Sequence, residues 1–330
     1  MNENVELEVV NLRKWFPVRK SLVQNLLSKK TEYVRAVDGV SFEVKKGEIF
    51  GLAGESGCGK TTTGKTILRL LEPTSGEIYF GGQDITALNK LEMKKMRQKM
   101  QIIYQDPYES INPRMTVFDI ISEPISVHKL AESQAETEEI IYKTLEEVEL
   151  FPAEDFVQRF PHELSGGQRQ RVAIARTMVL QPSFIVADEP ISMLDVSIRA
   201  GILKMMLKTK EAKDITYIFI THDLAYARHI CHRGAIMYLG KIVEMTSMDN
   251  LVKNPLHPYT IALMMAVPIP DPTYEKARAV ISGEVPTPIN PPPGCRFHPR
   301  CAQASDICSR EEPKLVEMGD GHFVACHQAI

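Results

Sequence analysis

The feature that most constrains this chain is a glycine-rich octapeptide that follows an apolar stretch. Residues 54–61 read Gly-Glu-Ser-Gly-Cys-Gly-Lys-Thr and match G-x-x-x-x-G-K-[ST], the pattern of a phosphate-binding loop between a strand and a helix. Glycines let backbone N–H groups converge on phosphate oxygens, and the following helix N-terminus adds a positive dipole. Lys60 is expected to reach the outer phosphates, and the Thr61 hydroxyl to ligate Mg²⁺. The glycine order G-x-x-G-x-G disfavours a dinucleotide-binding fold.

Strand and helix patterns alternate around this loop. Alternating apolar and polar residues predict strands within Val5–Val44, and the run 48–54 reads as a buried strand. Strands that alternate with helices predict an α/β fold with a mixed sheet and with sites at the carboxyl ends of strands. The remaining predictions are a helix over Thr61–Leu71, mainly helical structure over 87–180 with a loop at 106–114, helices near 196–211 and 223–232, strands at 76–82, 183–190 and 215–222, and a strand pair at 234–245.

Composition and charge narrow the class of protein. No apolar run approaches the roughly 20 residues that a membrane-spanning helix needs, and the N-terminal residues lack the layout of a signal peptide. We therefore expect a cytoplasmic protein whose membrane association comes through a partner. With 39 basic and 42 acidic residues and a net charge of −3, the chain lacks the concentrated basic footprint of a nucleic-acid binder.

A second candidate site is an acidic pair at the end of an apolar strand. Phe184–Ala187 lead directly to Asp188 and Glu189. Carboxylates at the end of a buried strand are costly unless a cation or water network lies nearby. We interpret Asp188 as holding Mg²⁺ through water and Glu189 as the general base that polarises the attacking water. The alternative, an acidic turn without a ligand, is disfavoured by the phosphate loop upstream.

A third motif suggests that two chains act together. Leu164-Ser165-Gly166-Gly167-Gln168 precedes a helical pattern, so serine and glycines again stand at a helix N-terminus suited to anions. One chain that carries a phosphate loop and a separate phosphate-reading element predicts a dimer, in which one subunit's element closes over the other's nucleotide.

These motifs, complete and in order, resemble those of ABC-transporter nucleotide-binding subunits along nearly the whole chain. Phe16, or the adjacent Trp15, resembles the aromatic residue that stacks on adenine. Gln105 resembles the Q-loop glutamine, which contacts Mg²⁺, and His222 the switch histidine near the γ-phosphate. Asp195 resembles the D-loop aspartate.

The resemblance implies an ATP and Mg²⁺ site and a P-loop NTPase core with a helical insertion over about 106–180. Its catalytic residues would be Glu189 and His222. The nucleotide and its Mg²⁺ would be bound by Phe16, Gly54, Glu55, Ser56, Gly57, Cys58, Gly59, Lys60, Thr61, Thr62, Gln105, Ser165, Gly166, Gly167, Gln168, Asp188 and Asp195, with Thr61, Gln105 and Asp188 around the metal.

The chain departs from the family's usual EPTSALD at two positions, where Ile191 and Met193 stand. Because Asp195 is retained, we expect activity with altered packing at the dimer contact. Cys58 occupies a variable position of the phosphate loop at a helix N-terminus, where a thiol pKa can fall. A redox switch there is weaker as an interpretation than a small packed side chain.

Four of the six cysteines crowd into the last 36 residues. Cys295, Cys301, Cys308 and Cys326 are spaced C-x₅-C-x₆-C-x₁₇-C. Four clustered thiols in a reducing compartment suit tetrahedral Zn²⁺ or an iron–sulfur cluster, and the spacing alone does not choose. Four unrelated buried thiols are the remaining alternative.

The proline-rich sequence around these cysteines resembles the C-terminal extension of oligopeptide and dipeptide importer ATPases, the Opp/Dpp family. The segments that carry it are Asn254–Thr260 and Ile289–Cys301, which we interpret as extended connectors. The resemblance implies an ABC ATPase domain over 1–254, an extension over 255–330 and a 4Fe–4S cluster on the four cysteines. His298 and His327 keep zinc open, and the insertion Val18–Tyr33 resembles that of the F-type subunit.

In that family the chain would be the ATP-hydrolysing motor of a binding-protein-dependent importer for di- or oligopeptides, with oligosaccharides or nickel as alternative cargo. Its partners would be a homologous D-type ATPase subunit, two transmembrane permease subunits and an extracytoplasmic binding protein, at the cytoplasmic face of the membrane. A soluble ABC ATPase of DNA repair or translation is disfavoured by the absence of long insertions and tandem ATPase domains. A redox-sensing regulator is the second rival.

Overall fold

The computed structural model describes residues 4–18, 31–266, 284 and 286–329. The chain forms two compact units. The first contains residues 1–44, 49–87 and 219–330, and the second contains residues 45–48 and 88–218. The boundary predicted at residue 254 lies inside the first unit and stays a prediction. Most of the predicted insertion at Val18–Tyr33 lies outside the described residues.

An antiparallel sheet in the first unit has the strand order β2-β1-β4-β5. Its members are β1 (Val5–Pro17), β2 (Tyr33–Lys45), β4 (Ser75–Phe80) and β5 (Gln83–Asp84). Strand β1 pairs with β4 so that Leu7 lies opposite Phe80. Leu7 and Val9 are buried on one face because side chains alternate along a strand. The strands predicted before the phosphate loop are thereby confirmed for the described residues.

A second group of strands in the first unit includes the one that ends at the phosphate loop. They are β3 (Ile49–Ala53), β9 (Arg233–Tyr238), β10 (Lys241–Ser247), β11 (Val316–Glu317) and β12 (Phe323–Val324), in the order β11-β12-β10-β9-β3. Strand β3 runs parallel to β9, while β10 pairs antiparallel with both β9 and β12. All five residues of β3 are buried, as expected for a central parallel strand.

The helices of the first unit are α2 (Lys60–Ile67), α10 (Leu224–Ile230), α11 (Met248–Lys253), α12 (Pro258–Ala266), a 3₁₀ turn (His298–Arg300) and α13 (Asp306–Arg310). Helix α2 ends four residues before the predicted Leu71. Helix α12 contradicts the expectation of an extended connector after Asn254. Its single proline, Pro258, stands at the first helical position, where the missing N–H group has no partner to lose.

The second unit contains a pair of parallel strands, β6 (Met100–Ile103) and β7 (Phe184–Asp188), in which Met100 lies opposite Phe184. Strand β8 (Thr216–Thr221) begins in the second unit and ends in the first. Strand β6 was not expected, since the whole span from 87 to 180 was predicted to be mainly helical. Its residues carry no alternation to distinguish four strand residues from the end of helix α3 (Lys90–Lys99) before them.

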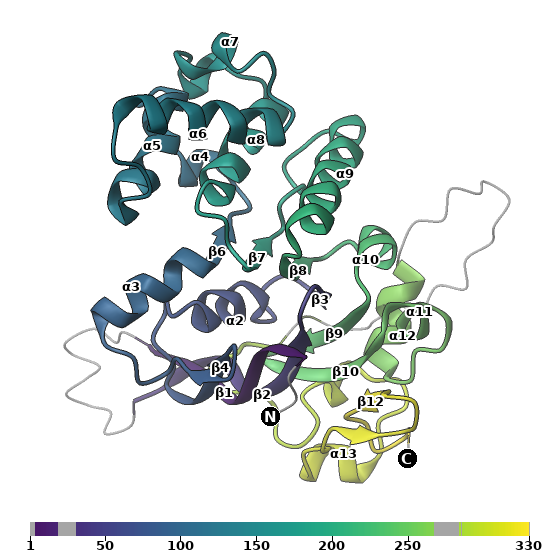
Figure 1. Ribbon diagram of the computed structural model, residues 1–330. Helices are drawn as coiled ribbons and strands as arrows, with labels where there is room; N and C mark the ends of the chain where they lie inside the picture. The colour runs from purple at the N-terminus through teal and green to yellow at the C-terminus, as the bar shows by residue number, and fades with distance from the viewer. Residues whose placement is uncertain (1–3, 19–30, 267–283, 285, 330) are drawn as a thin grey trace, which may run out of the picture. The chain divides into compact units, whose positions relative to one another are not determined.

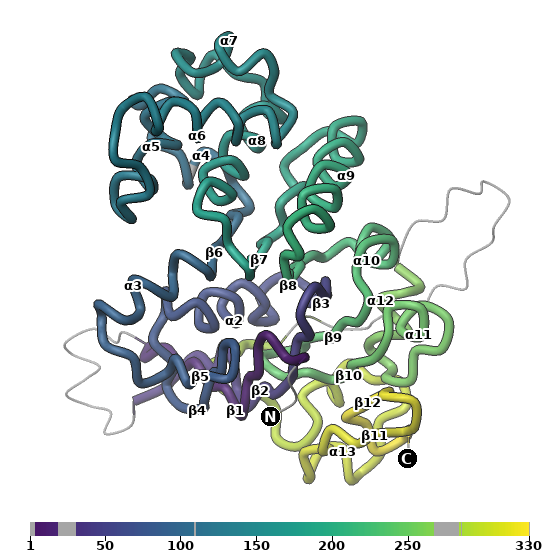
Figure 2. Tube along the Cα trace, in the orientation of Figure 1, coloured from purple at the N-terminus to yellow at the C-terminus, as the bar shows by residue number. Residues whose placement is uncertain are grey.

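Helices α4 to α8 gather at one end of the second unit (Figures 1 and 2). Pairs of them pack together, α8 against both α5 and α6. Thr116 and Ser165 begin α5 and α8 with reciprocal capping boxes, which satisfy backbone N–H groups at each N-terminus. The helices are α4 (Pro107–Ser110), α5 (Val117–His128), α6 (Gln134–Glu147), α7 (Glu154–Val157) and α8 (Gly166–Met178), followed after β7 by α9 (Val196–Lys213).

None of the helices within the described ranges is both long and apolar enough to cross a membrane.

A buried carboxylate ties the C-terminal segment to the strands of the first unit. Glu244 on β10 is fully buried, and its two oxygens accept hydrogen bonds from the backbone N–H groups of Leu256 (2.8 Å) and His257 (2.9 Å). The Nε2 atom of His322 lies 2.7 Å from the same carboxylate. Each partner offsets part of the desolvation of the charge. Hydrogen bonds to Glu244 therefore hold both the residues that precede α12 and His322, which precedes β12, against β10.

The buried imidazole of His257 makes this fastening sensitive to pH. Its Nδ1 atom accepts a hydrogen bond from the N–H of Tyr259 (3.0 Å), which requires an unprotonated Nδ1. Burial lowers the pKa of His257 to about 4. In the unfolded chain a histidine titrates near 6.5. Because the folded pKa lies below the unfolded one, the contribution to stability is complete above about pH 6.5 and is lost as the pH falls towards 4.

We therefore predict that His257→Asn reduces the pH dependence of the free energy of unfolding between pH 6.5 and 4. Asparagine keeps a side-chain acceptor for the helix N-terminus but does not titrate. Urea denaturation of both proteins across this range measures the effect, with the exposed His229→Asn as the matched control. An identical slope in wild type and His257→Asn would contradict the assignment.

Candidate functional site

The phosphate loop lies between β3 and α2 of the first unit, as predicted. Lys60 is 5% exposed, and its ammonium donates hydrogen bonds to the carbonyl oxygens of Gly54 (2.7 Å) and Glu55 (3.0 Å). The cation thus lies inside the turn of its own loop. A buried ammonium held by neutral carbonyls is suited to bind an anion that enters the loop.

Two glycines of the loop approach other backbone segments too closely for a side chain. Gly59 has φ +108°, and a Cβ atom there would lie 2.1 Å from the carbonyl oxygen of Ala36. Gly54 has φ +148°, and its Cβ would lie 2.3 Å from the carbonyl oxygen of Met237. Gly57, at φ +78°, faces open space within 4 Å. The loop therefore needs glycine at 54 and 59 for space, and at 57 for conformation alone.

Cys58 is a packed side chain of the loop. It is 3% exposed, and burial raises the pKa of its thiol, with the nearby Lys60 ammonium acting in the opposite direction. A buried, protonated thiol is a poor nucleophile. This geometry favours the packing interpretation of Cys58 over the redox switch.

The acidic pair stands at the end of β7 in the second unit. Asp188 is 4% exposed, and Glu189 follows with φ +48°, in the left-handed region that non-glycine residues seldom adopt. The amide nitrogen of Gln105 donates a hydrogen bond to the Glu189 carboxylate (3.2 Å). Two residues from separate motifs of the sequence, 84 positions apart, are therefore in contact. The positive φ of Glu189 is a backbone strain of the kind that is typical of functional positions.

The LSGGQ segment forms the N-terminus of α8. The Ser165 hydroxyl accepts from the N–H of Gln168 (3.3 Å), and the Gln168 side chain accepts from the N–H of Ser165 (2.9 Å). Ser165 and Gly166 are exposed, whereas Gly167 is buried, and a Cβ on Gly167 would lie 2.7 Å from the Ile198 side chain of α9. The predicted anion-binding helix terminus is thus presented to the outside of the second unit.

The two positions at which the chain differs from the family's usual EPTSALD lie in the segment before α9 and differ in exposure. Ile191 is 5% exposed and belongs to the core, whereas Met193 is 64% exposed. Asp195, at the N-terminal boundary of α9, is exposed, and so is its neighbour Val196 at 71%. Only the Met193 change therefore alters a surface that a second subunit could touch.

The two aromatic candidates at the end of β1 differ in their contacts. The Trp15 indole N–H donates to Asp38 (3.1 Å), and its ring packs against Tyr33 and the guanidinium of Arg35. Phe16 is half-buried, with the Lys14 ammonium 5.0 Å from its ring centroid. The indole N–H of Trp15 is engaged with Asp38 and its ring with Arg35 and Tyr33, which favours Phe16 for adenine stacking.

His222 follows β8 in the first unit and is exposed. Its neighbour Asp223 caps α10 by accepting from the N–H groups of Ala225 (3.0 Å) and Tyr226 (3.4 Å). The histidine therefore stands on a short turn that is fixed by a helix cap.

The metal cluster predicted on the four C-terminal cysteines is wrong. Cys295, Cys301, Cys308 and Cys326 are all free thiols, and no group of three or more His, Cys, Asp or Glu side chains in the described ranges could hold a metal ion. These residues therefore support neither an iron–sulfur cluster nor zinc.

Local contacts explain why the spacing misled. Ser305 lies 3.5 Å from the Cys308 sulfur, and the Cys326 sulfur accepts from the N–H of Gln328 (3.4 Å). Burial raises the pKa of the Cys295 thiol to about 11, which keeps it protonated. The two histidines that were considered as zinc ligands contact backbone carbonyl oxygens instead. The Nδ1 atom of His298 lies 2.8 Å from the carbonyl oxygen of Cys295, and the Nε2 atom of His327 lies 2.9 Å from that of Glu311.

Sequence reasoning missed two residues at the phosphate loop, Tyr259 and Arg300. The Tyr259 hydroxyl accepts a hydrogen bond from the N–H of Glu55, and the Arg300 guanidinium pairs with the Glu55 carboxylate. Both stand in the segments 254–260 and 289–301, which were used only as marks of family resemblance. Since they are more than 200 positions from the loop, no local pattern could connect them to it.

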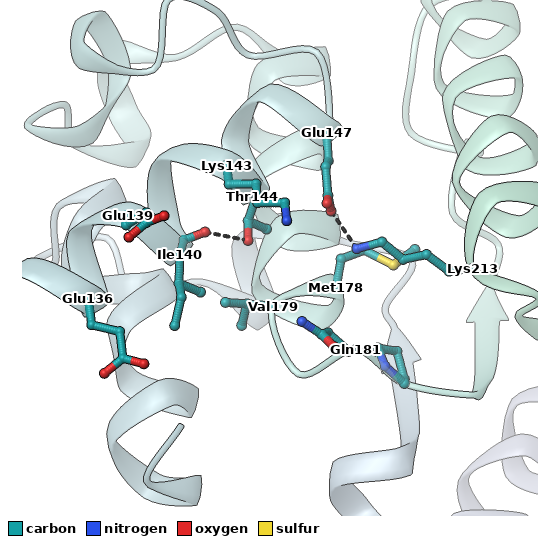
Figure 3. A pocket seen from close by; sticks show the side chains of 11 residues that line it. Glu136, Glu139, Ile140, Lys143, Thr144, Glu147, Met178, Val179, Gln181 and Lys213 are labelled. Carbon is teal, nitrogen blue, oxygen red and sulfur yellow. Dashed lines mark hydrogen bonds and ion pairs between the residues drawn. The ribbon is translucent and has the colours of Figure 1, made fainter. Parts of the chain in front are cut away.

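A cavity of about 590 Å³ in the second unit lies apart from all predicted site residues (Figure 3). Figure 3 shows Glu147 and Lys213 joined across it, with 2.5 Å between the carboxylate and the ammonium. Thr144 points its hydroxyl at the Ile140 carbonyl of its own helix (2.7 Å). Glu147, Lys213 and Thr144 are thus each engaged with a neighbouring group.

The fold and these motifs define the class of protein: an ATP-binding cassette ATPase. Residues 37–192 match the ABC transporter family model, and residues 243–308 match the model of the oligopeptide/dipeptide transporter C-terminal region. A dimeric, post-hydrolysis structure of the ATP-binding cassette MJ0796 bound to ADP and Pi is similar to this chain, with TM-score 0.63 and 28% identity over 73% of this chain and 98% of that one.

Two curated relatives from Bacillus subtilis (strain 168) extend the match over nearly the whole chain. The oligopeptide transport ATP-binding protein AppF is 47% identical and covers 99% of this chain and 98% of its own length. The putative oligopeptide transport ATP-binding protein YkfD is 48% identical, covering 90% of this chain and 91% of its own. The chain belongs to the oligopeptide/dipeptide family of ABC transporter ATP-binding subunits, and it is an ABC-type ATPase, which confirms the resemblance seen in the sequence.

The loop geometry predicts different outcomes for two alanine substitutions. Gly59→Ala places a Cβ on the Ala36 carbonyl, so the loop must shift, and MgATP affinity should fall by more than about tenfold, equivalent to about 1.4 kcal/mol. Gly57→Ala adds only the strain of a positive φ, roughly 1–2 kcal/mol of conformational energy without overlap. Titration with a fluorescent ATP analogue measures both, and a larger loss in Gly57→Ala than in Gly59→Ala would contradict this reading.

Proposed function

We propose that this chain is the motor subunit of a binding-protein-dependent importer of di- or oligopeptides and that it works as a dimer with a homologous ATPase subunit. The observation that carries this proposal is the exposed Ser165–Gly166 helix terminus, a phosphate-reading element in the same chain as a phosphate loop. In a dimer, each chain's LSGGQ covers the nucleotide of the other. The similarity to a dimeric ATP-binding cassette bound to ADP and Pi supports a dimer.

The residues of each site divide the work of holding MgATP. Lys60 and the loop N–H groups bind the phosphates, and Phe16 stacks on adenine. The Thr61 hydroxyl, the Gln105 amide oxygen and the Asp188 carboxylate are hard oxygen donors of the kind that Mg²⁺ prefers, so these residues fit that metal. Bound Mg²⁺ neutralises charge on the phosphate oxygens.

Glu189 and His222 carry out hydrolysis in this proposal. Glu189 accepts a proton from a water molecule while the oxygen of that water bonds to the γ-phosphorus. The bond between the γ-phosphorus and the bridging oxygen of ADP breaks. His222, which resembles the switch histidine, would stabilise the charge that develops on the γ-phosphate. The hydrogen bond from Gln105 fixes the Glu189 carboxylate before the nucleotide arrives.

The surface around Asp195 is proposed to meet the partner subunit. Met193 and Val196 flank Asp195 with exposed apolar side chains. The partner is a D-type subunit of the same family, which would carry its own phosphate loop.

A second surface is proposed to contact the two permease subunits at the cytoplasmic face of the membrane. It comprises the segment 105–118 and the segment 157–163 before the signature. Tyr108 in the first segment is 61% exposed, with the Arg169 guanidinium 4.1 Å from its ring centroid. Closure of the dimer pulls on the permeases through these segments, and hydrolysis reopens it. An extracytoplasmic binding protein delivers the cargo.

We predict that Glu189→Gln binds ATP but does not turn it over. Glutamine keeps the shape of the side chain and the contact with Gln105 but cannot accept the proton. ATPase rates should fall by about 10²-fold or more, the usual contribution of a general base, while nucleotide affinity is retained. Steady-state ATPase assays and ATP-dependent dimerisation in gel filtration measure the two effects.

The matched control is Glu123→Gln, which removes only a surface ion pair with Arg176 in the second unit. Because a D-type partner contributes a site of its own, the assay is run with that partner's general base also replaced. Wild-type hydrolysis by the doubly replaced complex would refute the assignment of Glu189.

The cargo is tested by transport in the assembled complex. The names of the relatives favour peptides; oligosaccharides and nickel are the alternatives. Reconstituted complex should take up labelled di- or oligopeptides in an ATP-dependent manner, and Lys60→Ala should abolish uptake. Uptake of nickel or an oligosaccharide in the same vesicles, with none of peptides, would overturn the peptide assignment and leave the motor role intact.

A further inference from the structure

The side chain of Glu55 is held by a residue from the other end of the chain. Glu55 is the second residue of the phosphate loop, and Arg300 stands in the 3₁₀ turn before Cys301. Two nitrogens of the Arg300 guanidinium donate to the two oxygens of the Glu55 carboxylate, at 2.8 and 3.2 Å. This two-pronged geometry is the strongest form of a carboxylate ion pair. Because Arg300 is 9% exposed, water screens the pair little.

The backbone of Glu55 is held as well. Its N–H donates to the hydroxyl of Tyr259 (2.8 Å), a fully buried residue of α12. Its carbonyl oxygen accepts from the Lys60 ammonium (3.0 Å). The N–H, the carbonyl and the carboxylate of one loop residue are therefore all fixed by side chains, two of which belong to the segment after residue 254.

An aromatic cluster fixes these two side chains in turn. The rings of Tyr238, Tyr259 and Phe297 pack with centroids 4.7 to 5.3 Å apart. The Tyr238 hydroxyl also accepts from Arg300 (3.3 Å). Burial raises the pKa of the Tyr259 phenol, so its hydroxyl stays neutral. Side chains locked in this way hold their hydrogen-bonding atoms in place before a ligand binds.

The charge of Glu55 makes this arrangement matter for phosphate binding. A carboxylate in a loop that binds a polyphosphate repels its ligand unless a cation neutralises it. Arg300 supplies that cation and turns the carboxylate towards the C-terminal segment. Lys60 is thereby left to serve the phosphates, since the Glu55 carboxylate is paired with a different cation.

We propose that Arg300 and Tyr259 are positioning residues for the phosphate loop: Arg300 neutralises and orients Glu55, and Tyr259 fixes the Glu55 backbone, so the C-terminal segment sets the affinity of the loop for MgATP. The proposal concerns nucleotide binding by this chain alone and is independent of cargo, partner subunit and permease.

The test is a double-mutant cycle on the purified full-length chain, read by titration with a fluorescent ATP analogue and Mg²⁺. Arg300→Met should weaken binding by about tenfold in the wild-type background, because it leaves the Glu55 carboxylate unpaired beside the phosphates. In a Glu55→Ala background the same change should weaken binding by less than about twofold, since the group through which Arg300 acts is gone.

Three further variants separate positioning from a merely structural role. Arg310→Met is the matched control: it makes the same substitution at an exposed arginine of the same segment and should bind like wild type. Arg300→Lys keeps a cation near Glu55 and should restore most of the affinity lost in Arg300→Met. Tyr259→Phe removes only the acceptor hydroxyl from a ring that stays packed, and should weaken MgATP binding by about threefold, in line with one neutral hydrogen bond.

Thermal unfolding by circular dichroism establishes that each variant is folded. Equal losses of affinity for Arg300→Met in the wild-type and Glu55→Ala backgrounds would overturn the role of Arg300 through Glu55. Should Arg300→Met not fold, Tyr259→Phe decides: wild-type MgATP affinity in that variant would overturn the proposal.

Discussion

The phosphate loop is a tight backbone turn whose own atoms lie against neighbouring carbonyl groups, and the first unit is arranged around it. Gly59 faces the carbonyl of Ala36 on β2, and Gly54 faces that of Met237 on β9. A strand on each side therefore shapes the loop, while β3 delivers the chain into it. Lys60 can be buried there only because carbonyl oxygens of the same turn surround its ammonium. The path of β2 and β9 thus bears directly on phosphate binding.

The C-terminal segment belongs to this arrangement. Glu244 fastens α12 and His322 to β10 through buried hydrogen bonds. Once α12 is docked, Tyr259 reaches the loop, and the 3₁₀ turn brings Arg300 to Glu55. A buried carboxylate must find partners on folding, and here its partners lie in the segment that reaches the nucleotide loop. The buried contacts of Glu244 therefore stabilise the same C-terminal segment whose Tyr259 and Arg300 contact the loop.

The cysteines show the limit of spacing as evidence. Four thiols close in the sequence suggested that they bind one metal ion or cluster, yet no metal-binding group forms among the described residues. A metal site needs side chains that converge on one point, and convergence depends on the path of the backbone between them. In this segment hydrogen bonds with Ser305 and Gln328 occupy two of the sulfurs, and burial keeps the Cys295 thiol protonated.

What the sequence determined by itself is local. The phosphate loop, the LSGGQ helix terminus and the acidic strand end are each written in a few adjacent residues, whose backbone geometry follows from glycine, capping and alternation. Strand β6 and helix α12 were missed because short or proline-flanked elements are decided by packing. Only the tertiary structure could join Gln105 to Glu189 and Arg300 to Glu55, pairs that are 84 and 245 positions apart. Such contacts depend on which strands pair and on where buried charges find partners, and no short stretch of sequence records that.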